Sequence, residues 1–300
     1  MDIIAIVIPI YNRLEITKMG LASIDISLSY YKTNGDNKYQ FRIIVVDDGS
    51  TDGTSAWIKN NYPEVIILNG NGNLWWTGSV NIGAKFAVEE LYCDYVLLWN
   101  DDTTCTENYF LELEIVIIGN LYENSILVSK IFWLNEDNVL FNFGCTFNKF
   151  TGSKKGIGYN EKDSDKYNVV MKVDWAGGMG TLIPSSILIK LNFFDFKNFP
   201  QYFGDFDFFL RAKESGYSAY AIPTLKIFND RETTGLYKVK NFKDFRNLLF
   251  SNRSMYNLKQ NVEFTKRHSN TIISWLRLLM IYSYHTATLI INLVLIGKEK

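Results

Sequence analysis

An alternation of strand-like and helix-like segments over residues 3–99 constrains the fold more than any other feature of the sequence. Apolar runs typical of buried strands occupy 3–9, 41–46, 65–68 and 95–99, and helical spacing is found at 14–29, 54–61 and 78–91. This order predicts a mainly parallel sheet covered by helices. Polar or glycine-rich sequence follows each strand, and open α/β sheets bind ligands at that edge. We therefore expect the polar clusters to converge there.

The remainder of the chain is less regular. Residues 135–172 break into short segments containing Gly and Asn, which predicts a β-rich insertion with loops, and residues 203–215 have the spacing of a helix. After about Thr234 the composition changes, because residues 238–277 carry nine Lys or Arg against two acidic residues and an apolar tail follows. We expect a main domain over residues 1–235 and a basic, apolar helical extension over 236–300.

Composition excludes several classes of protein. With 47% apolar residues in a chain of 300, a large core is expected and disorder is not. The net charge of -1 gives no general attraction to nucleic acid. Cys93, Cys105 and Cys145 are too few and too scattered for a disulfide framework or a zinc site. Because an apolar strand replaces the basic start of a signal peptide, we expect a cytoplasmic protein.

The first polar cluster, at residues 45–54, follows the second predicted strand. Its aspartates can accept hydrogen bonds from a base or ribose, and its glycines allow a tight turn close to a ligand. A simple strand-to-helix turn with Asp52 as the helix cap explains the same residues equally well.

A family resemblance favours the ligand-binding interpretation. Residues 8–13 (Ile-Pro-Ile-Tyr-Asn-Arg), followed by residues 46–52 (Val-Asp-Asp-Gly-Ser-Thr-Asp), closely resemble the opening of family 2 glycosyltransferases of the GT-A fold. The resemblance implies an α/β fold with a mixed, mainly parallel sheet flanked by helices. It also assigns Pro9, Tyr11, Arg13 and Asp47 to the nucleoside end of a nucleotide-sugar donor.

The second cluster, Asn100-Asp101-Asp102-Thr103, follows the fourth predicted strand. Loss of a diphosphate leaving group develops negative charge, so a divalent cation held by carboxylates is expected, and oxygen ligands favour Mg²⁺ or Mn²⁺. The usual family motif is Asp-x-Asp, and the version here resembles the Asn-x-Asp-Thr of rhamnosyltransferase-like members. We assign Asp102 to the metal and place Asn100 and Asp101 in the donor site. An acidic turn capping the next helix is the alternative.

Residues 69–83 combine glycines and amides with paired tryptophans before a helix. Backbone N–H groups at a helix start can bind phosphate or sugar oxygens, whereas tryptophans are more often part of a core. By resemblance to the family's Asn-x-Gly segments, this stretch lines the donor pocket through Asn73, Trp76, Gly78 and Asn81.

Residues 174–180 (Asp-Trp-Ala-Gly-Gly-Met-Gly) allow the backbone to lie close to a sugar, although a tight packing turn explains them equally well. By resemblance the segment lies beneath the donor sugar and the acceptor. This assigns Trp175, Gly177 and Gly178 to the acceptor site.

Residues 202–211 contain the candidate base. Inverting displacement needs a group that takes the proton of the acceptor hydroxyl, and a partly desolvated carboxylate suits this role. Asp205 and Asp207 point in different directions on a helix, and Arg211 can pair with Asp207 four residues earlier. We therefore predict Asp205 as the catalytic base, and Asp207 and Arg211 as acceptor contacts. The alternative is a surface helix with an ion pair. Gly204 replaces the Glu that usually precedes this Asp in the family.

The C-terminal extension has no catalytic pattern. His268 and His285 match no metal or catalytic spacing and are expected to be structural or solvated. The apolar stretch at 278–296 is borderline in length for spanning a bilayer. Together with the basic residues that precede it, this stretch favours a peripheral membrane contact slightly over a span. These basic residues are Lys238, Lys240, Lys243, Arg246, Arg253, Lys259, Lys266, Arg267 and Arg277. Packing of this extension against the main domain, or a contact in a homo-oligomer, explains the same sequence about equally well.

The resemblance, which covers about residues 3–235, implies an inverting glycosyltransferase. It would transfer a sugar, with rhamnose from dTDP-rhamnose weakly favoured, to a glycan or lipid-linked acceptor in bacterial surface polysaccharide synthesis at the inner face of the plasma membrane. The alternatives are transfer from a UDP-hexose or UDP-N-acetylhexosamine, and a non-catalytic sugar-nucleotide-binding protein. A dinucleotide-dependent oxidoreductase ranks far behind, because residues 9–13 replace the expected GxGxxG.

Overall fold

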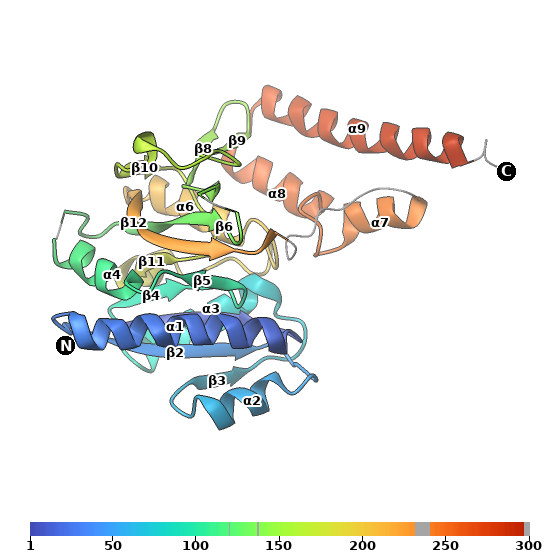
Figure 1. Cartoon of the computed structure of the whole chain (residues 1–300). Helices are drawn as coiled ribbons and strands as arrows, with labels where there is room; N and C mark the ends of the chain where they lie inside the picture. The colour runs from blue at the N-terminus through green and yellow to red at the C-terminus, as the bar shows by residue number, and fades with distance from the viewer. Residues whose placement is uncertain (120, 137, 232–240, 297–300) are drawn as a thin grey trace.

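Figure 1 shows the computed structural model, which describes residues 1–119, 121–136, 138–231 and 241–296, with side chains up to Asn292. The predicted boundary between residues 235 and 236 lies outside the described residues, as do Lys238 and Lys240.

A mixed sheet forms the centre of the molecule. Its strands are β1 (Asp2–Ile10), β2 (Tyr39–Asp47), β3 (Ile66–Asn69), β4 (Tyr95–Leu98), β5 (Thr103–Cys105), β6 (Ile126–Trp133), β7 (Leu140–Asn142), β10 (Met171–Val173), β11 (Thr181–Pro184) and β12 (Ala219–Asn229). The order is β10-β12-β6-β11-β4-β1-β2-β3, with β5 paired to β12 and β7 to β6. The four strands β3, β2, β1 and β4 are parallel, as predicted, and β11 runs antiparallel between β4 and β6.

The helices cover both faces of this sheet. They are α1 (Leu14–Asn34), α2 (Thr54–Asn61), α3 (Trp75–Glu89), α4 (Tyr109–Ile118), α5 (Ser185–Lys190) and α6 (Gly204–Glu214), followed by α7 (Phe242–Phe250), α8 (Leu258–His268) and α9 (Ile272–Ile296). The predicted helix at 54–61 coincides with α2, and the one at 203–215 corresponds to α6. The predicted β-rich insertion contains β7, the hairpin of β8 (Cys145–Asn148) and β9 (Ser153–Gly156), a 3₁₀ turn at Asp165–Tyr167, and β10.

Two apolar cores lie on opposite faces of the sheet. Because side chains alternate along a strand, Ala5 and Val7 of β1 join the core beneath α3, α5 and α6, whereas Ile4 and Ile6 join the core beneath α1, α2 and α4. Gly20 lets α1 approach the chain after β4, since a Cβ there would lie 2.4 Å from the carbonyl oxygen of Asp101. This close contact fixes the backbone from which the acidic cluster projects.

The C-terminal helices form an arm that leaves the body of the molecule on the right of Figure 1. Leu248 of α7 and Leu289 of α9 are the buried centre of a small core of their own. In the described part of the chain, no helix combines the length and the apolar character needed to cross a bilayer.

Candidate active site

The carboxyl ends of β1, β2 and β4 meet at one edge of the sheet. Ile10 pairs with Asp47, and Val7 pairs with Leu98, so the polar segments after these strands lie side by side. They border a cleft of about 930 Å³. The cleft is lined by Pro9, Ile10, Tyr11, Arg13, Ile16, Asp48, Gly72, Trp75, Trp76, Ser79, Asn100, Asp101, Asp102, Gln201, Tyr202, Asp244 and Arg253. Of the predicted donor and metal residues, it includes Pro9, Tyr11, Arg13, Trp76, Asn100, Asp101 and Asp102.

Arg13 bridges the two aspartates of the acidic cluster. Its guanidinium donates to Asp101 Oδ1 at 2.9 Å and to Asp102 Oδ2 at 3.0 Å. Burial raises the pKa of Asp101 to about 7, although the charge of Arg13 acts in the opposite direction. The second oxygens, Asp101 Oδ2 and Asp102 Oδ1, are buried and have no hydrogen-bond partner among the described residues.

These unpartnered oxygens suit a hard divalent cation, which binds carboxylates readily and completes its shell with water and phosphate oxygens. The described residues contain no cluster of three or more His, Cys, Asp or Glu side chains around a common point. A cation held here would therefore take only two protein carboxylates. Such a donor set is typical of Mg²⁺ bound together with substrate phosphates.

Asn100 holds the indole of Trp76 in place. Its side-chain oxygen accepts a hydrogen bond from Trp76 Nε1 at 2.9 Å, and Gln201 accepts one from the backbone N–H of Trp76 at 3.0 Å. The six-membered part of the ring lies against Gly178, where a Cβ would come within 2.1 Å of Trp76 Cζ2. Trp76 therefore connects the acidic cluster to the glycine segment predicted for the acceptor.

Asp205 lies next to that glycine segment, in the first turn of α6. A Cβ on Gly177 would lie 3.8 Å from Asp205 Oδ2, and the backbone N–H of Phe206 donates to Asp205 Oδ1 at 2.7 Å. Burial raises the pKa of Asp205 to about 6, against the opposing effects of the Phe206 N–H and the Lys154 charge. The carboxyl group thus titrates close to neutral pH, as a general base requires.

Trp175 packs against Phe206, the residue that follows Asp205. Its ring stacks on Phe206 with the centroids 4.2 Å apart and the planes 22° from parallel. The indole N–H of Trp175 is buried and has no partner among the described residues, so it can donate to a ligand oxygen.

Asp207 and Arg211 have a different environment from the one predicted. Their ion pair is confirmed at 2.8 Å, but Arg211 also donates to the backbone carbonyls of Leu191 and Phe193. Asp207 is fully buried and accepts from Arg267 at 2.7 Å and from His268 at 2.9 Å. These contacts attach α8 to α6. Like Asp205 and the other predicted acceptor residues, Asp207 and Arg211 are not among the residues that line the cleft.

Burial would raise the pKa of Asp207, but the hydrogen bond from His268 and the charges of Arg211 and Arg267 outweigh it and lower this pKa. Asp207 is therefore an anionic anchor for the extension. His268 is structural, in line with the prediction that it is not catalytic.

Four predicted donor residues lie outside the lining of the cleft. Asp47 accepts from the backbone N–H of Ser50 at 2.7 Å and from the hydroxyl of Ser55. Asn81 is buried and accepts from the backbone of Phe194, Gly78 packs on Leu74, and Asn73 is exposed. The second aspartate of the motif, Asp48, faces the cleft instead of Asp47.

Asp48 organises the loop between β3 and α3. Its carboxylate accepts from the backbone N–H groups of Gly72 at 2.8 Å, Leu74 at 2.9 Å and Trp75 at 3.1 Å. This loop therefore enters α3 with Trp75 at a positive φ of 58° and with both tryptophans at the cleft. Several lining residues that had no predicted role lie within the predicted polar segments, namely Asp48, Gly72, Trp75, Ser79 and Tyr202. Arg253 carried a different signal, as one of the basic residues of the extension.

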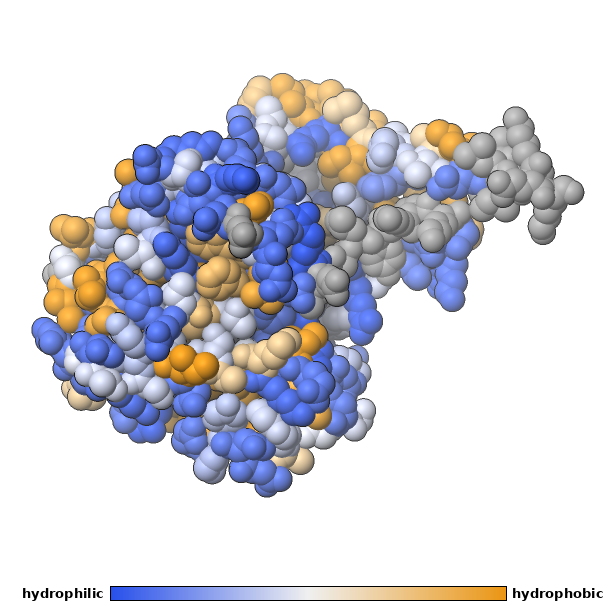
Figure 2. Space-filling model, in the orientation of Figure 1, coloured by the Kyte–Doolittle hydropathy of each residue, from blue (hydrophilic) through white to orange (hydrophobic). Residues whose placement is uncertain are grey.

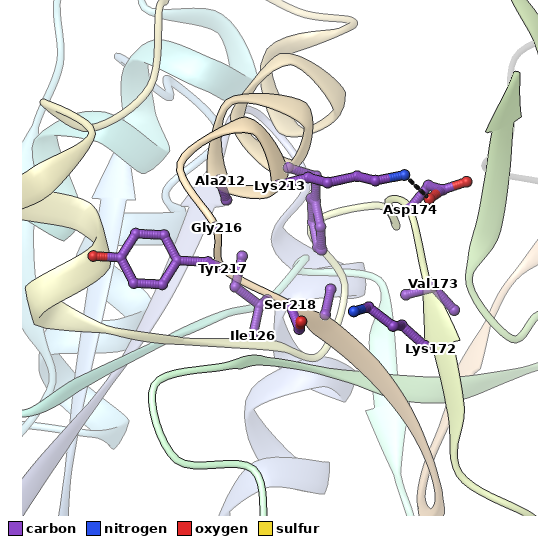
Figure 3. Close-up of a pocket in the computed structure, with 11 residues that line it drawn as sticks. Ile126, Lys172, Val173, Asp174, Ala212, Lys213, Gly216, Tyr217 and Ser218 are labelled. Atoms are coloured by element: carbon purple, nitrogen blue, oxygen red, sulfur yellow. Dashed lines mark hydrogen bonds and ion pairs between the residues drawn. The ribbon is translucent and has the colours of Figure 1, made fainter. Parts of the chain in front are cut away.

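A second hollow of about 490 Å³ lies at the β10–β12 edge of the sheet, beside the end of α6 (Figure 3). Its polar side chains include Lys172, Asp174 and Lys213, and Asp174 pairs with Lys213 at 2.6 Å. None of the predicted site residues lines it.

Comparisons with known proteins agree with this geometry. Residues 5–119 match the family model for Glycosyl transferase family 2. The low-salt glycan biosynthesis hexosyltransferase Agl10 of Haloferax volcanii is 21% identical over 255 residues, which cover 82% of this chain and 80% of that protein.

Two solved structures share the fold. One is GalNAc-T7 with UDP, GalNAc and Mn²⁺, with a TM-score of 0.56 and 12% identity over 92% of this chain. The other is residues 1–349 of S. aureus TarS in complex with UDP-GlcNAc, with a TM-score of 0.51 and 14% identity, covering 89% of this chain and 72% of that one. This chain spans 56% of the GalNAc-T7 chain. Residues 5–119 are thus similar to glycosyltransferase family 2, and the chain as a whole has the GT-A fold of these two structures.

Proposed function

We propose that this protein is an inverting glycosyltransferase that moves a sugar from a nucleoside-diphosphate donor to a hydroxyl of a glycan or lipid-linked acceptor. The observation that carries the proposal is the continuous arrangement from Asp102 through Asn100 and Trp76 to Gly178 and Asp205. In this proposal the indole ring of Trp76 links the candidate cation site to the candidate base.

In this reaction Asp205 accepts the proton of the acceptor hydroxyl while that oxygen forms a bond to the anomeric carbon. The bond from the anomeric carbon to the diphosphate breaks on the opposite face, and its electrons stay with the leaving oxygen. A Mg²⁺ or Mn²⁺ ion on Asp101 and Asp102 would neutralise the charge of the diphosphate when bound. Trp76 and Gly178 would hold the sugar between these groups, and Trp175 would contact the acceptor.

The donor sugar is the finer part of the proposal. The Asn100-Asp101-Asp102-Thr103 variant favours dTDP-rhamnose by family resemblance. The UDP-hexose alternative is supported by the name of the Haloferax volcanii relative, a hexosyltransferase, and by the UDP and UDP-GlcNAc in the two structural neighbours.

A donor panel tests both levels of the proposal. Release of the nucleoside diphosphate is measured for dTDP-rhamnose, UDP-glucose, UDP-galactose and UDP-N-acetylhexosamines with a matched set of lipid-linked acceptors and Mn²⁺. Transfer from one of these donors, with inversion at the anomeric carbon, is expected. Binding of a donor without turnover on any acceptor would favour a sugar-nucleotide-binding protein.

A peripheral membrane contact through α9 forms part of the proposal. Its exposed apolar side chains are Ile272, Ile273, Leu276, Leu279, Met280, Tyr284, Ile290 and Ile291. At 100° per residue they fall within an arc of roughly 140°, opposite the face that carries the buried Leu278 and Leu289. Figure 2 shows hydrophobic surface along this part of the arm.

The width of this apolar face favours a lipid surface over a narrow coiled-coil seam. No Asp or Glu occurs in α9 to repel anionic headgroups. Such a contact would bring the cleft to a lipid-linked acceptor at the cytoplasmic face of the plasma membrane.

Flotation with anionic vesicles tests the contact. The variant Leu276→Ser/Leu279→Ser/Met280→Ser should bind at least tenfold less vesicle, whereas Met19→Ser/Ile26→Ser on α1, which removes equally exposed apolar side chains, should bind as before. If the α9 variant changes only the sedimentation mass, the face joins two copies of the chain and the membrane contact is refuted.

A further inference from the structure

The charged side chains that line the cleft differ in the bonds that they make within the protein. Four carboxylates, those of Asp48, Asp101, Asp102 and Asp244, face two guanidinium groups, those of Arg13 and Arg253. Arg13 already bonds to both members of the acidic cluster, and Asp48 accepts three backbone N–H groups. Asp244 also has an interaction within the protein. The charge of Arg253 is therefore the one among the described lining residues that needs an explanation.

Arg253 comes from the C-terminal extension, in the turn between α7 and α8. Its guanidinium lies 5.8 Å from the ring centroid of Trp75, and its side chain is exposed at the cleft. In the part of the chain that the structure describes, no carboxylate forms an ion pair with it. A guanidinium over an aromatic face keeps its full charge and its donors, so it remains able to bind an anion.

The turn that carries Arg253 is firmly attached. Asn257 caps α8 by accepting from the backbone of Gln260, and its side-chain nitrogen donates to the carbonyl of Ser251 at 3.2 Å. The hydroxyl of Tyr282 in α9 donates to the carbonyl of Tyr256 at 2.9 Å. Because α8 is itself fixed to α6 through Asp207, the extension presents Arg253 to the cleft from a defined position.

We propose that Arg253 binds the diphosphate of the donor and of the released nucleoside diphosphate. This inference rests on the proposed function. The diphosphate of a nucleotide sugar carries two negative charges and gains a third when the bond to the anomeric carbon breaks and its electrons stay on oxygen. A divalent cation at Asp101 and Asp102 matches two of these charges, and the guanidinium matches the third. Its planar set of N–H donors also fits phosphate oxygens.

The proposal gives the C-terminal extension a role in donor binding. The cleft is then completed only when α7 and α8 are docked, so residues 5–119 alone, which match the family model, would bind nucleotide weakly. Stacking of Arg253 on Trp75 for purely structural reasons is the competing explanation, and the two differ in which ligands lose affinity.

Titration calorimetry of the full chain distinguishes them. UDP and dTDP, each with Mn²⁺, and the corresponding nucleosides are titrated into the wild type, Arg253→Ala, Arg253→Gln, Arg253→Lys and the control Arg246→Ala. Arg246 is an exposed arginine of the same extension that does not line the cleft. Melting temperatures of all variants are compared to verify folding.

For Arg253→Ala and Arg253→Gln we expect nucleoside diphosphate affinity to fall by about 10- to 100-fold, as for loss of a charge-assisted hydrogen bond. Nucleoside affinity should stay within about threefold, Arg253→Lys should retain part of the affinity, and Arg246→Ala should match the wild type. Unchanged diphosphate affinity, or equal losses for diphosphate and nucleoside, would overturn the role of Arg253. A wild type that binds neither UDP nor dTDP would instead contradict the proposed function.

Discussion

Replacing Asp205 with Asn removes the proposed base while keeping the shape of the side chain. Asparagine cannot take a proton from the acceptor, and a positioned general base contributes about 10²- to 10⁴-fold to rate. We therefore expect kcat to fall by at least about 100-fold while the affinity for nucleoside diphosphate stays within about threefold. The assay is release of nucleoside diphosphate under saturating donor, with calorimetry for binding. Asp165→Asn, which changes an exposed aspartate of the 3₁₀ turn at Asp165–Tyr167, is the control.

The pH dependence follows from the same group. With a pKa of about 6, the Asp205 carboxyl is roughly nine-tenths ionised at pH 7 and one-tenth ionised at pH 5, since each pH unit changes the ratio tenfold. The rate should therefore rise about tenfold from pH 5 to pH 7, and this limb should be missing in Asp205→Asn.

As the pH rises, the stability of the protein should change in the opposite direction to its activity. The folded-state pKa of Asp205 lies above its ordinary value, so ionisation of the buried group costs stability as the pH rises between those two values. Asp205→Asn should consequently melt no lower than the wild type at pH 7. A variant that retains more than a tenth of wild-type kcat, or that keeps the acid limb of the pH profile, would refute the assignment of the base.

Three other substitutions test separate contacts. Asp102→Asn removes a charged metal ligand, so it should raise the Mn²⁺ concentration needed for half-maximal nucleoside diphosphate binding by at least about tenfold. Electron paramagnetic resonance of free Mn²⁺ measures this, and an unchanged titration would exclude Asp102 as a metal ligand. Gly178→Ala should reduce activity by more than about tenfold and shift the tryptophan fluorescence, since its Cβ would collide with Trp76, whereas Gly119→Ala, with its nearest neighbour at 3.4 Å, should behave as the wild type. Asp207→Ala should lower the free energy of unfolding by about 3–5 kcal/mol in urea titrations, because it leaves Arg211, Arg267 and His268 without their shared buried partner; a loss below about 1 kcal/mol would show that the anchor is dispensable.

The strands and helices that place the site were predictable because their signals are local. The apolar spacing of residues 54–61 matches α2, and the first four strands and their parallel order follow from the alternation of segments. Helix α1 continues past the predicted end at residue 29 to Asn34. The extra turn is supported by Tyr31, which is buried and donates to Glu114, a residue far away in the sequence.

The contacts within the site were less predictable. Asp47 and Asp48 are adjacent at the end of β2 and point in different directions. The sequence alone could not show which of the two faces the cleft, and the structure has Asp48 there. The pair of Asp207 and Arg211 follows from helical spacing, but Arg267 and His268 reach the same carboxylate from about 60 positions later in the chain. Likewise, nothing local connects Asn100 with the indole of Trp76, or Arg253 with the cleft.

The most direct test of the central claim is a crystal structure of the full chain with nucleoside diphosphate and Mn²⁺, with the ion located by its anomalous signal. The account predicts Mn²⁺ between the diphosphate and the Asp101 and Asp102 carboxylates, with Asp205 facing the vacant sugar position across Trp76. A diphosphate bound away from the acidic cluster, or an Asp205 carboxyl without access to the position of the anomeric carbon, would contradict it.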